Sequence, residues 1–165
     1  MRFVYIKRRL EEVIKANLFQ GKVVVVYGAR QVGKTTLVRK IVEDLGVSNG
    51  YLNCDELDIL SRLQNADTSD SLKHILGGNK LVVIDEAQRV KNIGLKLKLM
   101  VDNFPEIQII ATGSSSFDLA NEINEPLTGR VFEFWLFPLS LDELFAKDQY
   151  IEANRKLNSL LVYGS

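Results

Sequence analysis

The sequence predicts an α/β fold in which helices cover both faces of a mostly parallel, five-stranded sheet. Short apolar runs alternate along the chain with segments whose apolar residues have helical spacing, the pattern of successive β-α-β units. The run "KLVVID" lacks the apolar–polar alternation of a half-exposed strand, which indicates burial on both of its faces. A glycine-containing loop, "YGARQVGKTT", joins an apolar run to a helical segment. We therefore expect a three-layer α-β-α sandwich.

The first half of the chain begins this alternation. A helix is expected at residues 6–19, followed by a valine-rich strand at residues 22–27. Residues 34–45 directly follow the loop and have the apolar spacing of a helix. A short strand at residues 50–56 and a polar helical stretch at residues 67–76 complete this half.

The second half predicts the remaining strands. We expect them at residues 80–85, 107–115 and 130–139, the last ended by Pro138, which lacks a backbone donor. Between the first two of these strands, residues 92–104 are expected to form a helix with one apolar stripe. The stripe consists of Ile93, Leu97, Met100, Val101 and Phe104.

We expect three parts along the chain. Residues 1–20 contain the N-terminal helix, residues 21–138 form the α/β core, and residues 139–165 begin a helical C-terminal extension. The amphipathic pattern of this extension ends in "LLVYGS", with no later segment for its apolar side chains to contact. We therefore expect the extension to continue in a longer protein. A small helical cap on the core is the alternative.

Composition limits the class of protein. The 165 residues include 46% apolar and 25% charged residues, as in an ordinary globular protein. The single cysteine, Cys54, cannot form an internal disulfide, which suits a reducing cytoplasm. No apolar run approaches the length of a membrane span, and the N-terminus has charges where an export signal needs apolar residues. We expect a cytoplasmic protein with no membrane partner.

The loop between residues 27 and 36 predicts a nucleotide site, because it matches G-x-x-x-x-G-K-[ST] at every fixed position. Glycines allow backbone N–H groups to approach phosphates, and the following helix directs its positive end at them. Lys34 is expected to reach the β- and γ-phosphates, and Thr35 to ligate Mg²⁺. The expected contact residues are Gly28, Ala29, Arg30, Gln31, Val32, Gly33, Lys34, Thr35 and Thr36.

Two adjacent carboxylates follow the run "LVVID". Asp85 falls at the carboxyl end of a buried strand, where α/β sheets place their ligands, and is expected to hold Mg²⁺. Glu86 can orient and polarise a water molecule that attacks the γ-phosphate, which favours nucleotide hydrolysis. The alternative is that both residues only cap the next helix.

Two further polar features are candidates for the site. Ser114, and secondly Thr112, are polar residues of the expected strand "IQIIATGSS" and are expected to contact the γ-phosphate or the attacking water. A serine-rich turn bonded to its own backbone is the alternative.

Arg130 precedes the last strand and can stabilise negative charge on the phosphoryl group. Supplied in trans, this arginine implies a homo-oligomer; a structural ion pair is the alternative.

With these elements placed, the sequence resembles the AAA+ division of P-loop ATPases. More narrowly, "YGARQVGKTTL", "VVIDEAQRV", "ATGSSSFDLA" and "LTGRVFEFWLFPLSLDEL" are similar to uncharacterised prokaryotic AAA-type ATPases that carry a C-terminal domain of unknown function. The resemblance covers nearly the whole chain. It implies a P-loop NTPase sheet of order 5-1-4-3-2, with Glu86 as the catalytic carboxylate, Ser114 as a sensor and Arg130 as an arginine finger.

We therefore predict Mg²⁺-dependent binding and hydrolysis of ATP that drives a conformational change in an attached C-terminal domain. GTP is disfavoured because the sequence lacks an [NT]-K-x-D motif. One alternative is a nucleic-acid-stimulated, helicase-like motor, because "DEAQ" and "ATGS" are similar to motifs of such motors. These motors usually need a second core. The other alternative is a binding module that nucleotide orders, with turnover incidental.

Charge gives little support for nucleic acid as a partner. Lys plus Arg and Asp plus Glu each number 21, so the net charge is zero. A basic cluster beside the Asp-Glu pair could still contact nucleic acid, but a solvated helix face is the favoured interpretation. The cluster consists of Arg89, Lys91, Lys96 and Lys98.

Overall fold

The computed structural model describes residues 5–114, 119–120, 123 and 125–145. The chain forms two compact units. The larger is Leu10–Phe137, and the smaller joins Met1–Arg9 to Pro138–Ser165. The residues predicted to carry the chemistry all belong to the larger unit.

The strands of the larger unit form one parallel sheet. Among the described residues they are β1 Val23–Tyr27, β2 Asn49–Asn53, β3 Leu81–Asp85, β4 Gln108–Gly113 and β5 Val131–Trp135. Their order is β2-β3-β4-β1-β5 and each neighbouring pair is parallel, which confirms the predicted 5-1-4-3-2 arrangement. Tyr27 lies beside Gly113 and Trp135, so the carboxyl ends of β1, β4 and β5 meet at one edge.

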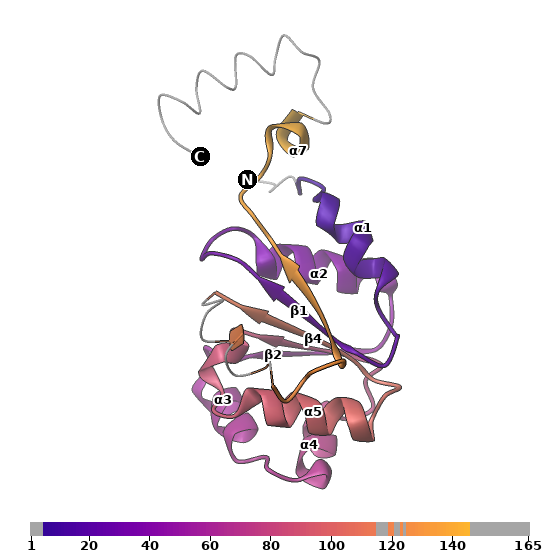
Figure 1. Ribbon diagram of the computed structural model, residues 1–165, viewed down its shortest axis with the longest axis vertical. Helices are drawn as coiled ribbons and strands as arrows, with labels where there is room; N and C mark the ends of the chain where they lie inside the picture. The colour runs from indigo at the N-terminus through magenta and orange to yellow at the C-terminus, as the bar shows by residue number, and fades with distance from the viewer. Residues whose placement is uncertain (1–4, 115–118, 121–122, 124, 146–165) are drawn as a thin grey trace. The chain divides into compact units, whose positions relative to one another are not determined.

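Helices cover both faces of the sheet, which confirms the three-layer sandwich (Figure 1). One layer contains α1, Arg9–Ala16, and α2, Lys34–Leu45. The other contains α3, Leu57–Gln64, α4, Ser69–Leu76, and α5, Ile93–Asn103. A single 3₁₀ turn, η1, Ala87–Arg89, follows β3.

Burial on both faces of the sheet explains why the valine-rich strand β1, and β3, show no apolar–polar alternation in the sequence. Every residue of β1 and of β3 is buried. Val24 and Val26 pack in the cluster that includes α1 and α2, whereas Val25 packs in the cluster that includes α3, α4 and α5. An apolar side chain is therefore needed at successive positions of these strands. The central strands thus hold their carboxyl ends rigidly.

Some elements differ from their predicted bounds. Helix α3 was not predicted, although its apolar residues Leu57, Ile59, Leu60 and Leu63 have helical spacing; it is only eight residues long, Leu63 alone is buried and Leu57 is 80% exposed. Helix α1 ends at Ala16 rather than at residue 19, since Phe19 adopts a left-handed φ of 57°. Helix α5 confirms the predicted stripe: four of its residues are buried and Phe104, which follows the helix, is partly buried.

The smaller unit contains the described start of the C-terminal extension. Helix α7, Leu141–Phe145, begins after Ser140, whose hydroxyl accepts a hydrogen bond from the Glu143 backbone N–H at 3.2 Å. The Glu143 side chain accepts one in return from the Ser140 N–H at 3.0 Å, which completes a capping box. Residues 146–165 of the predicted helix lie outside the described residues.

The basic cluster is not a solvated helix face at Lys96. This side chain is 3% exposed, and its ammonium donates to the carbonyl oxygens of Gln64 (3.2 Å) and Ala66 (2.9 Å). It also pairs with Asp67, at 2.6 Å. Lys96 therefore joins α5 to the segment between α3 and α4, because only a long cationic side chain satisfies these buried carbonyl groups. Lys91, in contrast, is exposed.

Candidate active site

The loop between β1 and α2 requires glycine at two of its positions. A Cβ atom on Gly28 would lie 2.5 Å from the Leu136 carbonyl oxygen, which follows β5. Gly33 is the N-cap of α2 and has a φ of 98°, in the left-handed region that glycine adopts most readily. Gln31 also has a positive φ, 63°. The loop backbone is thus bent between the carboxyl end of β1 and the N-terminus of α2.

Lys34 begins α2 and folds back over the loop. Its side chain is buried, and the ammonium donates to the carbonyl oxygens of Gly28 (2.8 Å) and Ala29 (2.9 Å). Burial lowers the pKa of Lys34, and the negative charges of Glu86 and Asp85 oppose this effect. Because burial disfavours the charged form of Lys34, an anionic ligand beside its ammonium would be bound favourably.

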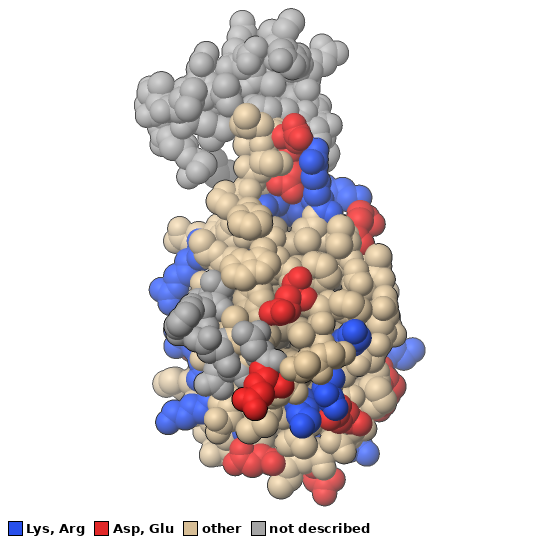
Figure 2. All heavy atoms as spheres, viewed as in Figure 1, with Lys and Arg blue, Asp and Glu red and all other residues tan. Residues whose placement is uncertain are grey.

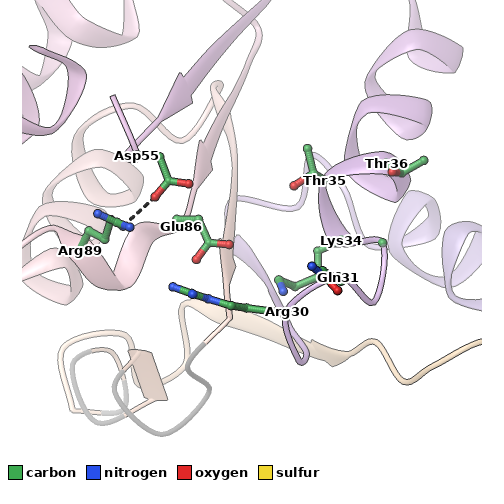
Figure 3. Close-up of a pocket in the computed structure, with 9 residues that line it drawn as sticks. Arg30, Gln31, Lys34, Thr35, Thr36, Asp55, Glu86 and Arg89 are labelled. Atoms are coloured by element: carbon green, nitrogen blue, oxygen red, sulfur yellow. Dashed lines mark ion pairs between the residues drawn. The ribbon is translucent and has the colours of Figure 1, made fainter. Parts of the chain in front are cut away.

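A cavity of about 560 Å³ opens beside the loop, within the size range of small-molecule sites (Figure 3). Figure 3 shows the loop and the start of α2 on one side, and Asp55, Glu86 and Arg89 on the other. The described lining residues are Arg30, Gln31, Gly33, Lys34, Thr35, Thr36, Asp55, Glu86 and Arg89. Of the predicted contact residues, Gly28, Ala29 and Val32 are therefore not in the lining.

Asp85 ends β3 and accepts hydrogen bonds from three hydroxyl groups. The Thr35 hydroxyl donates at 2.9 Å, and the hydroxyls of Tyr51 and Thr112 also donate to this carboxylate. Burial, followed by the bond to Asp85, raises the pKa of Tyr51 to about 12, so its hydroxyl remains a donor. The adjacent oxygens of Thr35 and Asp85 fit Mg²⁺, which prefers oxygen ligands and few protein groups.

Glu86 is held by two donors on one carboxylate oxygen. Its Oε2 accepts from Gln88 Nε2 at 2.6 Å and from the Ser114 hydroxyl at 2.7 Å. Gln88 Nε2 also donates to Ser114 Oγ at 3.1 Å, and the Glu86 N–H donates to Thr112 Oγ1 at 3.2 Å. Glu86 is the N-cap residue of η1, but its side chain makes no capping hydrogen bond. The helix-cap alternative therefore does not describe this carboxylate.

A comparison with protein families identifies the domain. A family model described as an AAA domain matches residues 20–145, more than half of the chain. The chain belongs to the AAA domain family. It contains a P-loop ATPase domain of the AAA+ type, in which the loop "YGARQVGKTT" links β1 to α2, Asp85 ends β3 and Glu86 follows it.

Solved structures share the fold of this AAA domain. A DNA replication initiation factor gives a TM-score of 0.53 at 15% identity, covering 99% of this chain and 63% of that chain. Pif1 helicase from Candida albicans gives a TM-score of 0.53 at 17% identity, covering 95% of this chain and 44% of that chain. The chain spans less than two thirds of either protein, and such low identities show the fold alone. No curated protein matches the sequence.

Arg130 lies away from the phosphate loop of the AAA domain. It directly precedes β5, whose first residue pairs with Val23, the first residue of β1, whereas the loop follows the last residue of β1. Its Nε atom pairs with Asp102 Oδ1 at 2.6 Å, and its backbone oxygen accepts from the Val23 N–H at 2.9 Å. The parallel pairing therefore places Arg130 at the opposite edge of the sheet, and the predicted structural ion pair is present.

Ser114 contacts Glu86 rather than lining the cavity. Four functional candidates carried no predicted role at the nucleotide site: Tyr51, Asp55, Gln88 and Arg89. Gln88 and Arg89 follow the Asp-Glu pair in "DEAQR", which is the signal that could have identified them. Tyr51 and Asp55 belong to β2 and the segment after it, and only the pairing of β2 with β3 brings them to the site.

No helix in the described part of the AAA domain has both the length and the apolar character needed to cross a membrane. On the face drawn in Figure 2, basic and acidic side chains lie interspersed.

Proposed function

We propose that the AAA domain binds Mg·ATP and hydrolyses it. The observation that carries this proposal is the setting of Glu86. One of its carboxylate oxygens is held by Gln88 and Ser114, and the side chain lines the cavity beside the phosphate loop. A carboxylate fixed in this way can accept a proton from a water molecule next to the terminal phosphate. Nucleotide binding without turnover would not require such a group.

Each residue has a distinct role in this proposal. Lys34 and the positive end of α2 bind the phosphates. Thr35 and Asp85 hold Mg²⁺, which when bound neutralises charge on the phosphate oxygens. Glu86 accepts a proton from water as the water oxygen bonds to the terminal phosphorus. The bond from that phosphorus to its bridging oxygen breaks, and ADP and inorganic phosphate are the products.

The first test is a phosphate-release assay. The chain is expected to release phosphate from ATP in buffer with Mg²⁺ and to lose this activity in EDTA, because charge neutralisation by the ion is then lost. Fluorescence titration with a labelled ATP measures binding in parallel. ATP binding without phosphate release in Mg²⁺ buffer would contradict hydrolysis and support the nucleotide-ordered binding module instead.

Nucleic acid is not part of the proposed function. Lys96 is committed to buried carbonyl groups and Arg89 lines the cavity proposed for the nucleotide, so of the basic cluster Lys91 and Lys98 remain for a nucleic-acid contact. The same phosphate-release assay, repeated at low salt with single-stranded DNA or RNA, is expected to give an unchanged rate. A severalfold increase that disappears as salt is raised would support the helicase-like motor.

Arg130 enters the proposal only as a residue supplied to a neighbouring subunit. Its place at the opposite edge of the sheet excludes contact with the phosphates of its own chain, and its ion pair with Asp102 is partly exposed and available for exchange. If it acts in trans, mixing Arg130→Ala protein with Glu86→Gln protein is expected to restore part of the ATPase rate, because mixed oligomers contain one intact site. Neither variant alone should show this rate. A mixture no more active than the sum of its components would assign Arg130 a structural role.

The family resemblance supports the wider setting of this activity. We propose that hydrolysis drives a conformational change in a C-terminal domain, in a cytoplasmic prokaryotic protein. The mass of the protein isolated from its source tests for the C-terminal domain, and limited proteolysis of that protein with ADP and with a non-hydrolysable ATP analogue tests for the conformational change.

A further inference from the structure

Arg89 lines the cavity from the side opposite the phosphate loop. It is the last residue of η1, three positions after Glu86, and its N–H donates to the Glu86 carbonyl oxygen at 3.1 Å. This turn places its side chain in the same cavity wall as the Glu86 carboxylate (Figure 3). The backbone position of Arg89 is therefore set by the turn that follows β3.

The guanidinium of Arg89 is only partly engaged. Its Nε atom pairs with Asp55 Oδ1 at 2.7 Å, and both side chains are about half exposed. Among the described residues, neither of its two terminal nitrogens has an acceptor. An arginine held through Nε presents these two N–H₂ groups as a fork, which matches the spacing of two phosphate oxygens.

The charges around the cavity favour an anion between its two sides. Lys34 lies on the loop side and Arg89 lies opposite it, and the Arg30 side chain extends from the loop toward Glu86 (Figure 3). Since Glu86 is the residue proposed to act on water beside the terminal phosphate, the phosphate nearest to Arg89 is that same one. ADP lacks this group, so a contact from Arg89 distinguishes the two nucleotides.

We propose that Arg89 binds the γ-phosphate of ATP within its own subunit, with Asp55 holding the guanidinium in position. This inference rests on the proposed function, because it assumes that ATP occupies the cavity. Arg89 thus contacts the γ-phosphate in cis. Arg130 cannot make this contact, because it lies at the opposite edge of the sheet. The pair formed by Arg89 and Asp55 thereby sets the preference of the site for ATP over ADP.

The test measures nucleotide affinity and needs no turnover. Isothermal titration calorimetry gives the Kd of the unmodified chain and of Arg89→Ala for ADP and for a non-hydrolysable β,γ-imido analogue of ATP, with Mg²⁺. Arg89→Ala is expected to weaken binding of the analogue by about 10- to 100-fold, the loss typical of a charge-assisted hydrogen bond. Its affinity for ADP is expected to change less than about twofold, because ADP has no group at this position.

The controls separate this inference from the proposed function. Arg62→Ala removes an exposed arginine of α3 that does not line the cavity, and should leave both affinities unchanged. Arg89→Lys keeps the charge but not the fork, and should recover part of the lost affinity. Equal loss for both nucleotides, or no loss for the analogue, would overturn the role of Arg89 while nucleotide binding stands. Failure of the unmodified chain to bind either nucleotide would overturn the proposed function and this inference with it.

Discussion

Glu86→Gln is expected to lower the rate of ATP hydrolysis by about 10²- to 10⁴-fold, the usual contribution of a general base. The amide keeps the size and shape of the carboxylate, and its oxygen can still accept from Gln88 and Ser114. It has no charge and accepts a proton poorly, so water beside the terminal phosphate is no longer polarised. A phosphate-release assay under single-turnover conditions measures this loss.

The Kd for ATP separates loss of chemistry from loss of binding. It is expected to stay within a few fold in Glu86→Gln, because the side chain acts on water rather than on the nucleotide. Glu106→Gln is the matched control, since this carboxylate is exposed and lies before β4, outside the cavity. An unchanged hydrolysis rate in Glu86→Gln would remove this residue from the reaction.

Lys34→Met is expected to weaken binding of both ATP and ADP by about 10- to 100-fold, because a charged donor to the phosphates is lost. Methionine retains most of the apolar stem while removing the ammonium that lies against Gly28 and Ala29. Calorimetric titration with each nucleotide in Mg²⁺ buffer measures the two Kd values. This pattern differs from that of Arg89→Ala, where only the triphosphate should be affected.

Lys40→Met provides the matched control for Lys34→Met. Lys40 lies on the same helix, pairs with Asp44 at 2.7 Å and does not line the cavity. Its replacement should leave both Kd values unchanged. If Lys34→Met bound ATP as tightly as the unmodified chain, the loop would not be the phosphate site.

Most of the fold could be predicted because its signals are local. The runs that form β1 and β3 are apolar at successive positions, and burial on both faces is the physical cause. Helix α3 gives the opposite case: Leu63 is buried, and Ile59 and Leu60 are partly buried against the same core. Its eight residues have helical spacing but are too few to identify a helix from periodicity alone.

The bent loop between β1 and α2 could be predicted from its residues, because its geometry depends on a few nearby backbone conformations. Gly33 has its left-handed φ within the loop itself, and Lys34 bonds to carbonyl groups only five and six residues away. The close approach of Gly28 to Leu136 is different, since it depends on β5 pairing with β1.

The sequence by itself determined the fold class, the strand order through family resemblance, and the placing of Lys34, Thr35, Asp85 and Glu86 at one edge of the sheet. Only the tertiary structure decided which side chains contact these residues. Ser114 contacts Glu86, Tyr51 reaches Asp85 across the β2–β3 pairing, and Arg130 lies at the far edge of the sheet. The physical reason is that these contacts join segments distant in the chain, so they depend on strand register and direction rather than on local spacing.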